Sequence, residues 1–224
     1  MEVGRGRRGA SSHGKLVPIP FSSIKMREGF WSPRQHANRA FGLRHGYEQL
    51  HKAGNLLDLR LAAGIESGRY VGKVFMDSDV YKWLEAIAYE LFKEDDSDLR
   101  RMSDEVIALV EKAQRPDGYI NSYFQIAAPE RQWKDLSHGH ELYCAGHLIE
   151  AAIAFKRLLG DLRLFDVAVR FVEHIDNRFG SGKIEGTPGH PEIELALVEL
   201  YRETGNERYL RLAKYFVDQR GKGL

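Results

Sequence analysis

Apolar residues recur at spacings of three and four along most of the chain, a pattern that predicts a succession of amphipathic helices. The alternation of apolar and polar residues that is typical of β-strands is nearly absent. Proline and glycine breaks divide the pattern into separate helical segments, preceded by a short extended stretch at 17–24. The segments predicted to be helical lie at about 32–53, 77–91, 97–114, 139–160, 164–175, 191–205 and 209–217. In the first of them we expect Ser32 to be the cap and Pro33 to lie in the first turn.

The turn at Gly160-Asp161 has a counterpart 45 residues later, at Gly205-Asn206. Apolar and basic residues on either side of the two turns match in the same order. A repeated helix–turn–helix unit is typical of a helical solenoid or an α/α toroid, whereas chance similarity between two amphipathic hairpins is the alternative. We therefore expect antiparallel helix hairpins arranged side by side.

Short turns and long loops alternate between the predicted helices. In a toroid of antiparallel hairpins, this alternation collects the long loops at one end, together with the first residues of the second, fourth and sixth helices. Three polar segments occupy those helix starts, namely 77–79, 138–141 and 189–194. We expect these segments, which are far apart in the sequence, to converge on one rim.

Four side chains at this rim are candidates for binding a sugar. A helix N-terminus disfavours a charged histidine, so His140 and His190 are expected to be neutral and able to hydrogen-bond hydroxyl groups. Asp77 and Asp79 can accept hydrogen bonds from hydroxyl groups. For each residue a purely structural role, as a helix cap or a solvated side chain, is an open alternative.

Residues in the loop after the third predicted helix could also line a polar cleft. They are Tyr119, Asn121, Tyr123, Phe124 and Trp133. The alternative is a tight turn at 116–118 that is anchored by a tyrosine.

Composition excludes several classes of protein. The formal net charge of the 224-residue chain is +1, whereas nucleic-acid-binding domains usually have a strong basic excess. No run of about 18 apolar residues is present to span a membrane. Residues 1–16 are basic and lack an apolar run, so we expect a disordered leader rather than a secretory signal, followed by one domain at 17–224. We expect a soluble, cytoplasmic protein.

Cys144 is the only cysteine of the chain. It cannot form an internal disulfide, and a metal site with several thiolates cannot be built from this chain alone. We expect Cys144 to be a buried packing thiol. A metal site that uses His138, His140 and rim carboxylates is a further alternative, but its spacing is not diagnostic.

Five motifs in the same order resemble glycoside hydrolase family 127, the β-L-arabinofuranosidase-like enzymes. The resemblance runs from about residue 17 to the end. The motifs are Gly29-Phe30-Trp31-Ser32-Pro33, the segment 75–85, Gln114-Arg115-Pro116-Asp117-Gly118-Tyr119, the segment 140–150 that begins His140-Glu141-Leu142-Tyr143, and the segment 189–197 that begins Gly189-His190-Pro191-Glu192.

The resemblance implies an all-α fold, here a partial (α/α)6 toroid of antiparallel helix hairpins, with β-sandwich domains after it. It also implies retaining hydrolysis of non-reducing-end β-L-arabinofuranosides by a zinc-bound cysteine nucleophile and a glutamate acid/base. In the family, zinc is held by a glutamate and three cysteines, none of which matches a position in this chain. We therefore expect no catalytic residue and no metal ligand here. His140 and His190 match substrate-contacting histidines, with Asp77 and Asp79 as plausible neighbours.

The predicted helices make up little more than half of a barrel with six hairpins. We therefore expect that the chain alone is inactive, and that a C-terminal half or a second chain closes the barrel. A sugar epimerase or unsaturated-uronyl hydrolase on the same toroid is one alternative, with the two histidines as proton shuttles. A helical-repeat module with a concave protein-binding face is another.

Overall fold

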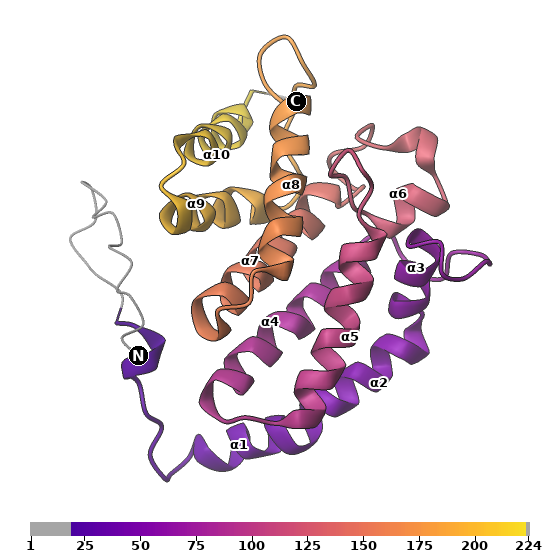
Figure 1. Ribbon diagram of the computed structural model, residues 1–224. Helices are drawn as coiled ribbons and strands as arrows, with labels where there is room; N and C mark the ends of the chain where they lie inside the picture. The colour runs from indigo at the N-terminus through magenta and orange to yellow at the C-terminus, as the bar shows by residue number, and fades with distance from the viewer. Residues whose placement is uncertain (1–18, 223–224) are drawn as a thin grey trace.

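The computed structural model describes residues 19–222, so the predicted leader at 1–16 lies outside the described residues. The described chain is helical and contains no β-strand, apart from one isolated bridge between Phe179 and Ile184 (Figure 1). The helices are α1 (Ser32–Ala37), α2 (Leu43–Ala53), α3 (Asn55–Ala62), α4 (Asp77–Lys93), α5 (Ser97–Ala113), α6 (Ser122–Ile126), α7 (Glu141–Leu159), α8 (Arg163–Arg178), α9 (Glu192–Thr204) and α10 (Glu207–Gln219). A π-helical segment, Asn38–Gly42, joins α1 to α2.

The apolar periodicity correctly predicted the long helices, and the differences lie in short elements. The first predicted helix is interrupted by the π-helical segment, and Trp31 rather than Ser32 occupies its N-cap, without a capping side chain. A 3-10 turn, Phe21–Ser23, interrupts the predicted extended stretch. α3 and α6 were missed because they are too short to show a clear helical period.

The two matching turns reverse the chain in the same way. Gly160 ends α7 and Gly205 ends α9, each with φ of 71°, a left-handed conformation that favours glycine. Asn206 then caps α10 by accepting a hydrogen bond from the Arg208 N–H. The prediction of two successive antiparallel hairpins is therefore confirmed.

The hairpins form two layers of helices. α7 packs most extensively against α4 on one side and α9 on the other, while α5, α8 and α10 lie outside them (Figure 1). A continuous apolar core fills the space between the layers, with Leu84, Leu148 and Leu197 of the inner helices fully buried. The fold is an all-α partial toroid. No helix among the described residues is long and apolar enough to cross a membrane.

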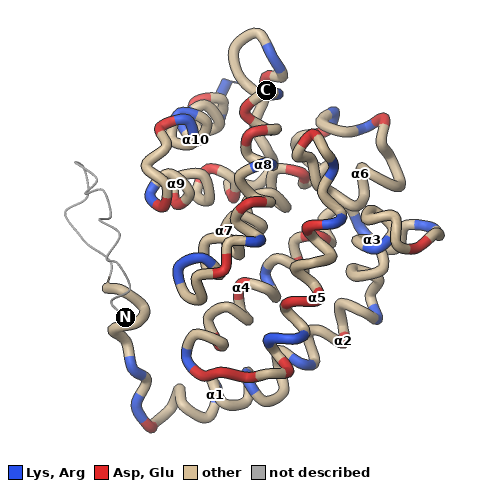
Figure 2. Tube along the Cα trace, in the orientation of Figure 1, with Lys and Arg blue, Asp and Glu red and all other residues tan. Residues whose placement is uncertain are grey.

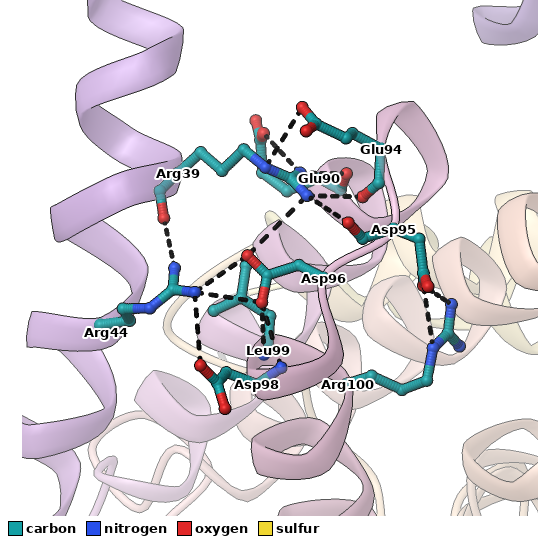
Figure 3. Close-up of polar contacts among 9 residues, drawn as sticks. All are labelled: Arg39, Arg44, Glu90, Glu94, Asp95, Asp96, Asp98, Leu99 and Arg100. Atoms are coloured by element: carbon teal, nitrogen blue, oxygen red, sulfur yellow. Dashed lines mark hydrogen bonds and ion pairs between the residues drawn. The ribbon is translucent and has the colours of Figure 1, made fainter.

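An arginine of the π-helical segment fixes the first helices to the end of α4. The Arg39 guanidinium donates to the carbonyl oxygens of Glu90 (2.9 Å), Glu94 (2.7 Å) and Asp95 (3.1 Å) (Figure 3). The Glu90 carbonyl lies in the last turn of α4, and those of Glu94 and Asp95 follow directly after the helix, where helical hydrogen bonds end. The turn between α4 and α5 is acidic (Figure 2), and Arg44 of α2 donates to both carboxylate oxygens of Asp96 in this turn.

Candidate functional site

The starts of α4, α7 and α9 meet at one end of the helix layers, as the alternation of loop lengths predicts. The ring centroids of His140 and His190 are 5.2 Å apart, with an angle of 44° between the rings. Phe75, just before α4, lies 5.5 Å from His140, and Tyr143 of α7 lies 5.1 Å from His190. The predicted convergence of three separate segments on one rim is confirmed.

His140 lies in an unusual backbone conformation at the start of α7. Its φ is 59°, in the left-handed region that few residues other than glycine adopt. Its Nδ1 lies within hydrogen-bonding distance of the His138 carbonyl oxygen, which can only accept. When the ring is neutral, Nδ1 therefore carries the proton and Nε2 is the acceptor. His190 is exposed beside it.

The two candidate aspartates differ in their surroundings. Asp77 is buried, and both of its carboxylate oxygens accept hydrogen bonds from Ser122, one from the N–H and one from the hydroxyl. Burial raises its pKa, and the bonds from Ser122 oppose that rise. Asp79 is exposed, with 47% of its side chain accessible, next to Lys82. The structure thus places Asp79 at the rim, whereas the Asp77 carboxylate ties α4 to α6.

Below the histidine pair, a lysine and a tyrosine join two inner helices. The Lys82 ammonium donates to the Tyr143 hydroxyl at 2.7 Å and to Ser78 Oγ at 3.2 Å. The Tyr143 ring also lies 4.6 Å from the ring of His147, whose Nδ1 is 3.4 Å from Glu192 Oε1. Burial, and then the Lys82 charge, lower the pKa of His147 to about 4, so this ring is neutral at pH 7.

Carboxyl groups continue this polar face along the inner helices. Burial raises the pKa of Glu85 on α4, of Glu192 on α9, and of Glu150 on α7, the last to about 7. Neighbouring carboxylates raise the pKa of Glu150 further. Sequence reasoning did not single out Lys82, Tyr143, Glu85 or Glu150, and it placed Glu192 at the rim only as part of the segment 189–194. The signal was present, since 140, 143, 147 and 150 lie at helical spacing on one face of α7.

The residues predicted to line a polar cleft after α5 are mostly part of the core. Tyr119, Asn121, Phe124 and Trp133 are buried, and Tyr123 is partly buried. The cleft prediction is therefore wrong for the four buried residues, and the alternative of a turn anchored by a tyrosine is correct. The reason is that the Tyr119 hydroxyl has a buried acceptor, the carboxylate of Glu141.

Cys144 is buried on α7, as predicted, and its thiol donates to the Phe75 carbonyl oxygen at 3.7 Å. Burial raises the pKa of this thiol well above its ordinary value, so it stays protonated and is a poor nucleophile. Between residues 19 and 222, no group of three or more His, Cys, Asp or Glu side chains is placed to hold a metal ion. The described residues therefore do not fit a zinc ion, and the zinc expected from the resemblance stays a prediction.

Comparison with known proteins agrees with the resemblance. Residues 23–224 match the family model for the β-L-arabinofuranosidase, GH127 catalytic domain. The chain belongs to glycoside hydrolase family 127. As a GH127 domain it is related to glycosidases.

Individual relatives support the family assignment, and this GH127 chain spans about a third or less of their length. A non-reducing-end β-L-arabinofuranosidase of Bifidobacterium longum is 42% identical over 177 residues, which are 76% of this chain and 27% of the relative. A GH127 β-L-arabinofuranosidase from Geobacillus stearothermophilus T6 superimposes with a TM-score of 0.86 and 43% identity, over 89% of this chain and 33% of that chain. A second solved GH127 β-arabinofuranosidase has a TM-score of 0.85 and 33% identity, over 91% and 34% of the two chains.

Proposed function

We propose that this GH127 chain supplies one side of a pocket for a non-reducing-end β-L-arabinofuranosyl unit, with His140 and His190 as its hydrogen-bonding groups. The observation that carries the proposal is the contact between the two imidazole rings at the rim of the inner helices. Asp79 is exposed at the same rim and adds a carboxylate acceptor. Asp77 is not included, because both of its oxygens are bonded to Ser122.

The pocket offers both acceptors and donors, as a furanose with several hydroxyl groups requires. A neutral His140 accepts through Nε2, because its Nδ1 faces the carbonyl of His138. The Lys82 ammonium and the Tyr143 hydroxyl lie directly beneath and supply donors. Phe75 and Tyr143 add aromatic surface against which the apolar face of a sugar ring can pack.

Cleavage of the glycosidic bond is assigned to groups other than those described here. Cys144 is a buried, protonated thiol, and the described residues do not fit zinc. We therefore propose that residues 1–224 alone have negligible glycosidase activity, while a longer GH127 chain that also carries the zinc ligands has both zinc and activity. Strong zinc-dependent hydrolysis by residues 1–224 alone would refute this part of the proposal.

Sugar binding by the purified chain tests the pocket directly. We expect methyl β-L-arabinofuranoside to shift the imidazole signals of His140 and His190 in NMR spectra of histidine-labelled protein, and methyl β-D-galactopyranoside to shift them much less. His140→Ala and His190→Ala should each weaken binding by about tenfold, since each removes a hydrogen bond to the sugar. His36→Ala, which alters an exposed residue of α1, is the control.

Two results would overturn the proposal. One is binding of the arabinofuranoside that is unaffected by both histidine substitutions, which would place the sugar elsewhere. The other is equal affinity for the two sugars, which would remove the assignment of the substrate class.

A further inference from the structure

Glu141, the first residue of α7, is a buried carboxyl group held by two hydrogen bonds. The Tyr119 hydroxyl donates to its Oε1 at 2.5 Å, and the backbone N–H of Trp133 donates to its Oε2 at 2.8 Å. Only 3% of Glu141 is exposed. Acidic residues at helix starts usually interact with their own helix end from the surface. This one instead reaches back to a residue eight positions earlier and into the core.

The bond from the Trp133 N–H closes the loop at residues 133–140, which we name the rim loop, and the bond from Tyr119 anchors the Glu141 carboxyl group to the core. Trp133 at its start and His140 at its end are the non-glycine residues with positive φ among residues 19–222, each at 59°. Such conformations cost free energy and persist when surrounding contacts determine them. Trp133 is held by the Glu141 carboxylate through its N–H and by His174 through its indole N–H (3.4 Å). The loop is therefore fixed at its base by Glu141.

The rim loop contacts both histidine segments. It leads directly into His140, whose Nδ1 lies against the carbonyl of His138. It also accepts a hydrogen bond at the Leu136 carbonyl from the N–H of Gly189, the residue before His190 (3.3 Å). A side chain on Gly189 would collide with the Ser137 carbonyl oxygen. The rim loop and the segment that carries His190 therefore pack backbone against backbone at this point. One loop thus sets the position of both imidazole rings.

We propose that Glu141 is a positioning residue: by bonding Trp133 and Tyr119 it holds the rim loop, and through that loop it sets the contact between His140 and His190. This inference deepens the proposed function, on which its significance rests, but the geometry it describes can be measured without any sugar. Glu141 would thus shape the pocket although its own side chain is buried in the core.

The test compares three variants at pH 6 by NMR, with two readouts. The first is the through-space signal between the rings of His140 and His190, and the second is hydrogen exchange of the Trp133 and Gly189 amides. Glu141→Ala should abolish the ring-to-ring signal and speed exchange at both amides by about tenfold or more, because a buried hydrogen bond to a carboxyl group is lost. Glu141→Gln should preserve both readouts, because its amide oxygen can accept from Trp133 and its amide N–H can donate to the Tyr119 oxygen.

Glu207→Ala is the matched control. Glu207 is also the first residue of a helix, α10, and also accepts from a tyrosine hydroxyl, that of Tyr201 (3.3 Å), but it lies on the surface away from the rim loop. Its replacement should leave both readouts unchanged. If Glu141→Ala does not fold, Tyr119→Phe is measured instead. This variant removes one of the two bonds, and we expect faster exchange at Trp133 and Gly189 but not at amides in the middle of α10.

The proposal is overturned if Glu141→Ala, or Tyr119→Phe in its place, retains the ring-to-ring signal and the slow exchange of both amides. It is also overturned if Glu141→Gln loses them although its helices stay intact. Failure of arabinofuranoside binding in the wild-type chain, with these NMR readouts as expected, would count against the proposed function and not against the role of Glu141.

Discussion

The Lys82 ammonium donates to the Tyr143 hydroxyl at 2.7 Å, and this bond joins α4 to α7 directly beneath the two rim histidines. The same ammonium lies 4.8 Å from the centroid of the Tyr143 ring. Tyr143 in turn contacts His140, His147 and His190. Lys82 is therefore one contact away from three imidazole rings, and its charge lowers the pKa of one of them, His147.

Replacing this lysine should change the titration of His147. We expect Lys82→Met to raise the pKa of His147 above about 4, because a positive charge that opposes protonation is removed. The pKa should stay below the ordinary value of 6.5, since burial is the larger cause of the shift. Titration of the His147 ring signals by NMR measures both limits. Lys214→Met, on the exposed surface of α10, should have no effect, and a fall in the pKa of His147 in Lys82→Met would contradict the prediction.

The stability of the protein should fall as the pH rises above about 5. Burial raises the pKa of Glu141 and Glu150 to about 7 and that of Asp58 to about 6, so these carboxyl groups bind more protons in the folded protein than in the unfolded chain. His147, whose pKa is lowered to about 4, has the opposite effect below about pH 6.5, but it is outweighed by the three carboxyl groups. Their stabilising contribution is complete below the unfolded-state pKa and is lost as the pH passes the folded-state pKa. For Glu141, the difference between 4.5 and about 7 corresponds to about 3 kcal/mol.

Urea unfolding from pH 4 to pH 8 measures this dependence. Below about pH 4 the trend should reverse, because the Leu99 N–H lowers the pKa of Asp96 and that carboxylate then loses its bonds. Glu141→Gln should flatten the decline between pH 5 and pH 8 by about 1–3 kcal/mol, since Gln does not ionise. A wild-type protein that gains stability from pH 5 to pH 8 would show that burial does not dominate these carboxyl groups.

The Arg39 guanidinium should be a major contributor to stability. It is 13% exposed and closes the end of α4 through three carbonyl oxygens (Figure 3). We expect Arg39→Ala to lower the free energy of unfolding by about 1–3 kcal/mol, because three carbonyl oxygens lose a largely buried charged donor. Arg39→Lys should recover only part of the loss, since an ammonium lacks the planar fork of a guanidinium. Arg34→Ala, an exposed neighbour, should change stability by less than about 0.5 kcal/mol, and an equal effect of both alanine variants would contradict this role.

Gly146 allows α7 and α9 to approach closely. An added Cβ would lie 2.5 Å from Glu192 Cγ and 3.1 Å from the Glu192 backbone carbon, which cannot move without shifting α9. Alanine is favoured over glycine in a helix by about 1 kcal/mol, whereas overpacking costs about 1–3 kcal/mol. We therefore expect Gly146→Ala to be destabilising by about 1–2 kcal/mol in urea unfolding.

Gly42→Ala is the control for this substitution. Its Cβ would meet only the end of the Asn38 side chain, which can rotate away, so we expect neutral or slightly increased stability. If Gly146→Ala were as stable as wild type, α7 and α9 would be less tightly packed than the structure describes.

The sequence predicted the long helices because each has a buried stripe at helical spacing and ends at a strong break. Gly160 and Gly205 end α7 and α9 in left-handed conformations that glycine favours. The convergence of His140 and His190 was also predictable, since loop lengths alone determine which helix ends share a rim. These features depend on residues close together in the chain.

Features that depend on distant pairs could not be predicted in this way. Asp77 looked like a rim ligand or a cap, but its partner is Ser122, 45 residues later. Trp133 looked like a cleft residue, but its N–H is held by Glu141. α3 was missed because it follows Gly54 without a linker and spans only two turns. Buried polar pairs between distant residues do not produce a periodic pattern in the sequence. The contacts that position the histidines could therefore be recognised only from the structure.

The turns at Gly160 and Gly205 lie at the end of the inner helices opposite the rim loop, and both glycines are exposed. Extra residues are tolerated best where few backbone contacts cross a turn. These two turns are therefore suitable places to insert an affinity tag or a fluorophore, because lengthening them does not disturb the contacts that hold His140 and His190. The rim loop has no comparable freedom, and an insertion there would displace both histidines together.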